Sequence, residues 1–133
     1  MRGVDTNVLI RFLVGDDPDQ ASRAAGMFAR ATAEGERLFV AQIVVCELAW
    51  VLRQAYDKSR EEIAAAIEAL LRTRQLLFED VGQIRSALER YAAGEGDLAD
   101  WLIWERSRVA GAECVVTFDG RLLRSPEFAE ATP

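Results

Sequence analysis

The chain has 133 residues, about the length of one domain, and 50% of them are hydrophobic, which is enough to bury a core. It contains no histidine, and its 16 Lys and Arg against 22 Asp and Glu give a formal net charge of −6. The missing histidine excludes Ser-His-Asp and Cys-His catalysis and histidine-based acid–base chemistry. Two cysteines cannot form a structural zinc site without histidine partners. Any chemistry must therefore rest on carboxylates, hydroxyls, arginines or a bound cofactor.

The cysteines and the N-terminus bear on the cellular compartment. Cys46 and Cys114 lie in apolar segments without CxxC spacing, so we expect buried free thiols, as in a reducing compartment. Asp5 interrupts any hydrophobic leader, and no apolar run approaches the ~20 residues of a membrane helix. We therefore expect a soluble, cytoplasmic protein.

Apolar spacing and capping residues predict strands and helices in alternation. The expected strands are residues 1–4, 37–41, 75–78 and 114–118, and the expected helices are residues 8–13, 18–33, 43–56, 59–71, 80–93 and 97–111. Asp17 and Pro18 are signals for a helix start, and Ser59 with Glu62 forms a capping-box pattern. This order predicts a single α/β domain over residues 1–133, with a mostly parallel central sheet flanked by helices. In such sheets the functional crevice lies beyond the carboxyl ends of the strands.

Five acids stand where a globular protein seldom places one. Asp5 and Asp119 each follow a predicted strand, and Glu47 interrupts an apolar stretch of helix. Asp97 and Asp100 open a helix three residues apart and therefore share one face. A carboxylate in apolar surroundings costs several kcal/mol unless it is paired or binds a metal. Converging carboxylates would suit a hard cation such as Mg²⁺ or Mn²⁺.

Each acid also fits an ordinary structural role. Asp5 can cap the helix that follows it, and Glu47 can pair with an arginine. Asp97 and Asp100 are favourable residues at a helix start, and Asp119 in Phe-Asp-Gly is typical of a turn. Only the combination of the five acids points to a site.

Four segments together resemble the PIN-domain nucleases, and among them the VapC-type toxins of prokaryotic type II toxin–antitoxin pairs. They are Val-Asp-Thr-Asn-Val-Leu-Ile-Arg at 4–11, Val-Cys-Glu-Leu-Ala at 45–49, Asp-Leu-Ala-Asp-Trp-Leu-Ile at 97–103 and Val-Val-Thr-Phe-Asp at 115–119. The likeness covers the whole chain in order. It implies a PIN-like fold and a metal-dependent endoribonuclease.

The resemblance also assigns roles to residues. The implied catalytic acids are Asp5, Glu47, Asp100 and Asp119; the implied metal ligands are Asp5, Asp100, Glu47 and Asp97; and the implied supporting residues are Thr6, Asn7 and Thr117. One departure is that Trp101 and Trp104 stand where family members tend to have small residues. We expect these rings to pack in the core or in a dimer interface.

A mechanism follows from the acids and from the missing histidine. The carboxylates would hold Mg²⁺, with Mn²⁺ as the alternative, to polarise the scissile phosphate and activate water. Since no histidine is present to deprotonate the RNA 2′-hydroxyl, we expect 5′-phosphate and 3′-hydroxyl ends. A net charge of −6 disfavours binding to RNA, which is itself negative. Without the five candidate acids, whose charge a bound metal would offset, the net charge is only −1. The arginines expected at the rim of the site are Arg11, Arg106, Arg108, Arg121 and Arg124.

The expected partners come from the resemblance. VapC-type toxins form homodimers and are silenced by a cognate VapB-type antitoxin, and we expect no membrane association. Three alternatives stay open: a PIN-like RNA-processing nuclease outside a toxin–antitoxin pair, a non-nuclease phosphotransfer domain, and a binding module. A phosphotransfer domain would need Asp-x-Asp or Asp-Asp near the first strand and a late lysine. This chain has Asp-Thr-Asn there, and its only lysine is Lys58.

Overall fold

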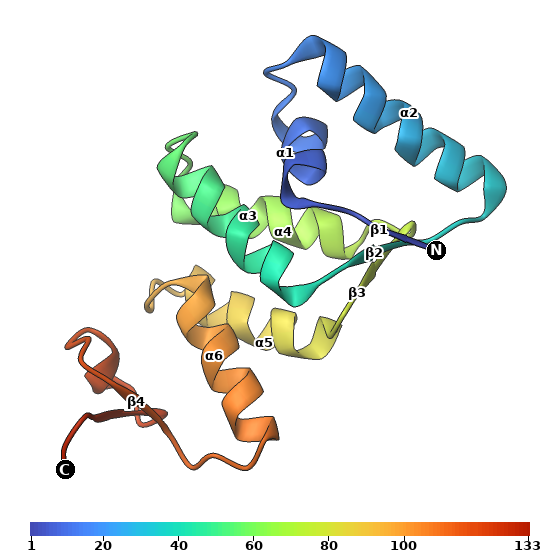
Figure 1. The fold of residues 1–133 in the computed structure, drawn as a ribbon. Helices are drawn as coiled ribbons and strands as arrows, with labels where there is room; N and C mark the ends of the chain where they lie inside the picture. Colours follow the sequence, from blue (N-terminus) through green and yellow to red (C-terminus); the bar gives the residue numbers. More distant parts are fainter. The chain divides into compact units, whose positions relative to one another are not determined.

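The computed structural model describes residues 1–133 as two compact units, Met1–Val81 and Gly82–Pro133 (Figure 1). Both units combine helices and strands, and every strand pair is parallel. The predicted α/β class with a parallel sheet is confirmed. No helix in the chain has the length and apolar character needed to cross a bilayer.

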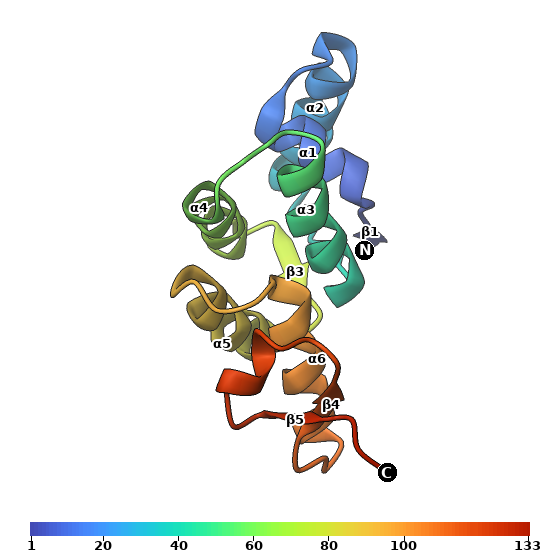
Figure 2. The same ribbon diagram turned by 90° about the vertical axis from the view of Figure 1, so that its left-hand side faces the viewer.

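The first unit contains a three-stranded sheet and four helices. Its elements are β1 (Arg2–Gly3), α1 (Thr6–Val14), α2 (Pro18–Glu34), β2 (Leu38–Val40), α3 (Gln42–Gln54), α4 (Arg60–Leu71) and β3 (Leu76–Phe78). The strand order is β1-β2-β3. Helix α1 packs against both α2 and α3, and α3 packs against α4, as Figures 1 and 2 show.

Capping residues set the helix boundaries of this unit. The Asp17 carboxylate accepts a hydrogen bond from the Gln20 backbone N–H, and α2 ends at Gly35 in the left-handed conformation (φ 66°). Ser59 and Glu62 form the predicted capping box at the start of α4.

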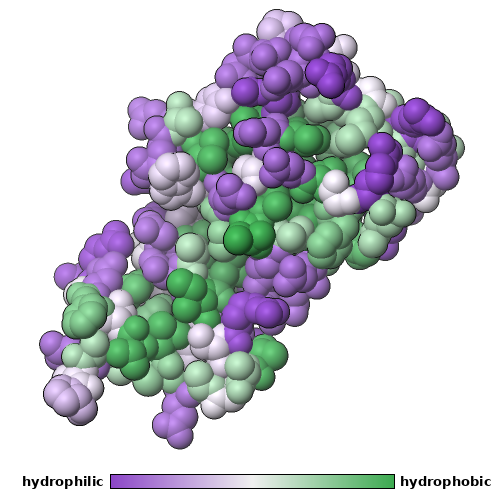
Figure 3. Space-filling model, viewed as in Figure 1, coloured by the Kyte–Doolittle hydropathy of each residue, from purple (hydrophilic) through white to green (hydrophobic).

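The core of the first unit follows the predicted periodicity. Side chains with essentially no exposed surface come from α1, β2, α3 and α4, and they include Leu9, Ile10, Leu38, Val40, Leu48, Ile63 and Ile67. Helix α2 buries Ala24, Phe28 and Ala31 on one face. Its outer side carries mostly hydrophilic side chains, which lie at the top of the view in Figure 3.

The second unit is smaller and is built around an aromatic core. Its elements are α5 (Val81–Ala92), α6 (Leu98–Val109), β4 (Val115–Thr117), the 3₁₀ turn η1 (Leu122–Arg124) and β5 (Phe128–Glu130), with β4 paired to β5. Trp101 is buried and lies edge-on to Phe128, with ring centroids 5.2 Å apart. Its indole N–H donates to the Glu95 carbonyl at 2.8 Å, and the Arg90 guanidinium lies 3.8 Å from the centre of the ring.

The six predicted helices and four predicted strands are all present, with boundaries shifted by a few residues. The structure also contains η1 and β5, which are not among the predicted elements. Both residues of β1 are exposed, and the buried residue of the predicted first strand is Val4, which follows β1. Cys46 and Cys114 are free as expected, but each is only half-buried. Burial raises the pKa of the Cys46 thiol.

Candidate functional site

Thr6 connects two of the candidate acids within the first unit. Its backbone N–H donates to Asp5 Oδ1 at 2.7 Å, and its hydroxyl donates to Glu47 Oε1 at 3.1 Å. Asp5 is the N-cap of α1, two residues beyond the end of β1, and Glu47 lies on α3. The capping role considered for Asp5 is therefore real. It fixes one of the carboxylate oxygens and leaves the other without a hydrogen-bond partner.

The surroundings of these acids differ from the expectation. The apolar stretch around Glu47 predicts a buried carboxylate, whereas both Asp5 and Glu47 are exposed and only Thr6 is buried. The cause is the helical period of α3. Val44 and Leu48 face the core, while Glu47 lies on the solvent-exposed face of the helix.

In the second unit, Asp97 and Asp100 begin α6. The Asp97 backbone N–H donates to Asp100 Oδ2 at 2.8 Å, so Asp100 provides one half of a capping box. Asp97 is exposed and Asp100 is half-buried. Partial loss of solvent, together with the charges of Asp97 and Asp119, raises the pKa of Asp100 above its ordinary value. A bound cation would therefore stabilise the charged form of the Asp100 carboxylate.

Asp119 lies two residues beyond the end of β4 and is engaged by Arg121. The Arg121 guanidinium donates to Asp119 Oδ2 from Nη2 at 2.8 Å and to Oδ1 from Nε at 3.1 Å. These hydrogen bonds lower the pKa of Asp119 below its ordinary value. Arg121 Nη2 also lies 3.9 Å from Asp97 Oδ2. Arg121 is predicted to lie at the rim of the site, but in the structure its side chain donates to both carboxylate oxygens of a candidate acid.

The supporting residues have distinct surroundings. The Thr117 hydroxyl accepts a hydrogen bond from the Asp119 backbone N–H at 3.0 Å, so it shapes the turn that carries the acid. Asn7 is exposed on the first turn of α1. Trp101 packs in the core as expected, which excludes it as a stacking surface for an RNA base.

The donor chemistry fits a hard divalent cation. Asp5, Glu47 and Asp100 each use one carboxylate oxygen in the hydrogen bonds described above and keep the second oxygen without such a partner. Carboxylate oxygens are the ligands that Mg²⁺ and Mn²⁺ prefer. Neither unit by itself gathers three acidic or thiol side chains into a group that could hold a metal ion. The donors in each unit are thus suitable in kind but too few to form a complete metal site there.

Comparison with known proteins identifies the family. A family model described as PIN domain matches residues 4–127, a range that includes all five acids. The chain is also 30% identical to a VapC ribonuclease of Aquifex aeolicus (strain VF5) over 133 residues, which covers 100% of this chain and 97% of that relative. These two matches show that the chain belongs to the PIN-domain family.

Proposed function

We infer that this protein is a metal-dependent endoribonuclease that hydrolyses RNA phosphodiester bonds as the toxin of a type II toxin–antitoxin pair. The observation that carries the proposal is the Thr6 bridge, which joins Asp5 and Glu47 from two separate elements at the carboxyl end of β1. A pair of oriented, exposed carboxylates is suited to a polyanionic substrate only when a cation accompanies it. Family membership and the similarity to a VapC ribonuclease support the same reaction.

We assign the binding of the metal to Asp5, Glu47, Asp97 and Asp100, with Mg²⁺ as the cation and Mn²⁺ as the alternative. When bound, the cation would polarise the scissile phosphate and lower the pKa of a water molecule. Asp5 and Glu47 supply negative charge in a fixed orientation, because Thr6 holds one oxygen of each. Thr117 positions Asp119, and Arg121 neutralises that acid. No histidine is present to deprotonate the 2′-hydroxyl, so the expected products carry 5′-phosphate and 3′-hydroxyl ends.

The cleavage reaction is tested with purified protein on cellular RNA, in Mg²⁺ and in EDTA, with the ligated ends mapped by sequencing. We expect cleavage that requires both Mg²⁺ and Asp5, so that Asp5→Asn lowers the rate by about 100-fold or more. Glu34→Gln is the matched control, because it neutralises an exposed carboxylate on α2 that pairs with Arg30. Cleavage that survives EDTA, or products with 2′,3′-cyclic phosphates, would contradict the mechanism.

As a toxin of this type, the protein is proposed to act in the cytoplasm, to form a homodimer and to bind a VapB-type antitoxin. Expression of the protein in a bacterial host should arrest growth, and Asp5→Asn should abolish the arrest. Coexpression of the protein encoded by the adjoining gene should restore growth and yield a stable complex on size exclusion. Light scattering on the purified protein should give twice the mass of one chain. A monomer that no neighbouring gene product binds would favour an RNA-processing nuclease outside a toxin–antitoxin pair.

A further inference from the structure

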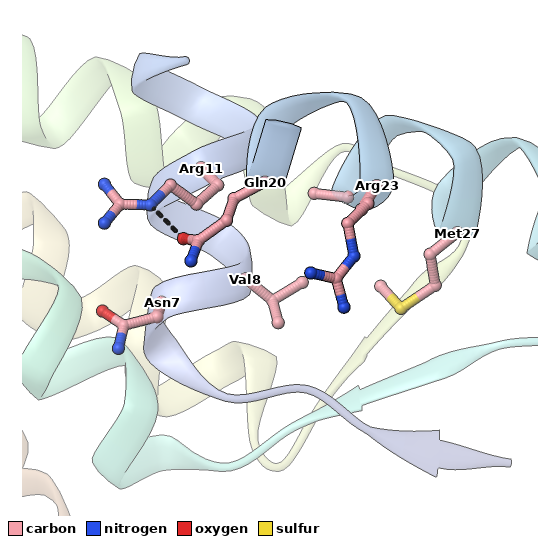
Figure 4. A pocket seen from close by; sticks show the side chains of 7 residues that line it. Asn7, Val8, Arg11, Gln20, Arg23 and Met27 are labelled. Atoms are coloured by element: carbon pink, nitrogen blue, oxygen red, sulfur yellow. Dashed lines mark hydrogen bonds between the residues drawn. The ribbon is translucent and has the colours of Figure 1, made fainter. Parts of the chain in front are cut away.

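A pocket of about 400 Å³ lies between α1 and α2 and is not used by the acids (Figure 4). Asn7, Val8 and Arg11 of α1 line it together with residues of α2, which are Gln20, Arg23, Ala24 and Met27. Its volume falls within the range of small-ligand sites. Figure 4 shows Asn7 and Arg11 at one end of the pocket and Arg23 and Met27 at the other.

The charged groups of this pocket are arginines, and no carboxylate lines it. Arg11 is fixed in place: it donates to Gln20 Oε1 and to Asp16 Oδ1, each at 2.7 Å, and to the Tyr56 hydroxyl at 2.8 Å. Its charge is therefore largely balanced by Asp16.

Arg23 differs from Arg11, because its guanidinium is exposed and loosely held. The nearest acid is Asp19, with 3.7 Å between Nη1 and Oδ2, and the two side chains are 77% and 80% exposed. An ion pair of this kind contributes little, so the guanidinium can turn to an anion at small cost. In Figure 4 it projects between Val8 and Met27, over the apolar part of the pocket.

One end of the pocket is next in sequence to the candidate site, because Asn7 belongs to its lining. Asn7 directly follows Thr6, which holds Asp5 and Glu47, and it is therefore about 7 Å from Asp5 at most when measured between Cα atoms. A phosphodiester strand bound at Asp5 would meet the Asn7 amide next. Beyond Asn7 it would meet the apolar surface of Val8 and the cation of Arg23.

We propose that this pocket binds one nucleotide of the RNA strand adjacent to the scissile phosphate, with Arg23 contacting its phosphate and Val8, Ala24 and Met27 receiving its base or ribose. The inference rests on the proposed ribonuclease function and adds the residues that position the substrate. A phosphate contact of this kind acts on binding and leaves the chemical step unchanged. Arg23 is thus a substrate-binding residue of the strand next to the cleaved bond.

The test measures RNA binding by fluorescence anisotropy in the Asp5→Asn background with Mg²⁺, which keeps the RNA uncut. The probe is a fluorescein-labelled fragment that spans the cleavage point mapped in the cleavage assay. Arg23→Gln should weaken binding about five- to tenfold, as for the loss of one charge-assisted contact. The slope of log affinity against log salt should also fall by about 0.7, the value for one phosphate contact on a single strand.

Arg30→Gln is the matched control, because Arg30 is an equally exposed arginine of α2 that pairs with Glu34 and lies outside the pocket. It should leave both the affinity and the salt slope unchanged. In the catalytically intact protein, Arg23→Gln should raise KM and leave kcat as it is. Thermal unfolding checks that both variants fold.

Three outcomes would overturn the proposal. Unchanged RNA affinity and salt slope in Arg23→Gln would remove the pocket from the RNA path while leaving the nuclease function intact. Weakened binding of the antitoxin with unchanged RNA binding would assign the pocket to a protein partner. Absence of any Asp5-dependent cleavage would refute the proposed function, and the nucleotide pocket with it.

Discussion

The hydroxyl of Thr6 donates a hydrogen bond to Glu47, a residue 41 positions later in the chain, at 3.1 Å. The same residue holds Asp5 through its backbone N–H. One buried side chain therefore sets the orientation of two exposed carboxylates on different elements. Groups that orient metal-binding carboxylates commonly matter to activity nearly as much as the ligands themselves.

Thr6→Val should consequently reduce RNA cleavage by about 10- to 100-fold, because it removes the donor to Glu47 and keeps the shape of the side chain. The accompanying loss of stability should be about 1 kcal/mol. Thr6→Ser should retain most of the activity. Thr32→Val is the control, since its hydroxyl donates only to the Phe28 carbonyl of the same helix, and it should leave the cleavage rate unchanged.

Asp100→Asn should raise the thermal unfolding temperature in EDTA at neutral pH while it abolishes cleavage. The raised pKa of Asp100 means that the folded state holds the proton more tightly than the unfolded chain does. Protonated Asp100 therefore adds to the free energy of unfolding below the ordinary aspartate pKa of about 3.9. This contribution is lost as the pH rises through the folded-state pKa. The neutral amide avoids this loss, so the advantage of the variant should grow from acid to neutral pH.

Asp19→Asn provides the contrast for that experiment. Asp19 also lies in the first turn of a helix, but it is exposed, and its charge favours the helix N-terminus. Its replacement should lower the unfolding temperature slightly. A fall of similar size in Asp100→Asn would show that partial burial of Asp100 does not outweigh the helix dipole.

Gly96→Ala should destabilise the protein by about 2 kcal/mol or more, because Gly96 has a positive φ of 52° and no space for a side chain. An added Cβ would lie 2.9 Å from Leu122 Cδ2 and 3.2 Å from Asp100 Oδ2. Gly35→Ala is the matched control. Its φ is 66°, also in the left-handed region, but the position is open, so it should cost only about 1 kcal/mol of backbone strain. Equal losses in chemical denaturation would contradict the crowding argument.

Arg121→Gln should return the pKa of Asp119 toward its ordinary value. In the wild type the ion pair lowers that pKa, so the pair persists at neutral pH and is lost only as the pH falls through the lowered value. NMR titration of the Asp119 carboxyl carbon measures this change directly. Removing the cation beside Asp97 and Asp119 should also strengthen Mn²⁺ binding, as seen by calorimetry.

Arg124→Gln removes an exposed arginine of η1 that is not bonded to Asp119, and it serves as the control for Arg121→Gln. It should change neither the Asp119 titration nor the Mn²⁺ affinity. If both variants shifted the Asp119 pKa equally, the effect would come from overall charge and not from the paired guanidinium.

The sequence by itself determined the local structure. Capping signals such as Asp17 and Ser59 with Glu62, and the spacing of apolar residues, depend on neighbours within a few positions, so the six helices and four strands could be read from them. The ordered motifs around the acids also identified the PIN-domain family, because a motif survives as a sequence pattern whatever the packing around it.

Only the tertiary structure decided the surroundings of the side chains. β5 is three residues long and forms through its pairing with β4, so its own sequence carries too weak a signal. The exposure of Glu47 depends on which face of α3 meets the core, and the Thr6 contact joins residues far apart in the chain. The engagement of Asp119 by Arg121 likewise depends on the turn after β4. Long-range contacts and solvent exposure are properties of packing, which residue spacing does not specify.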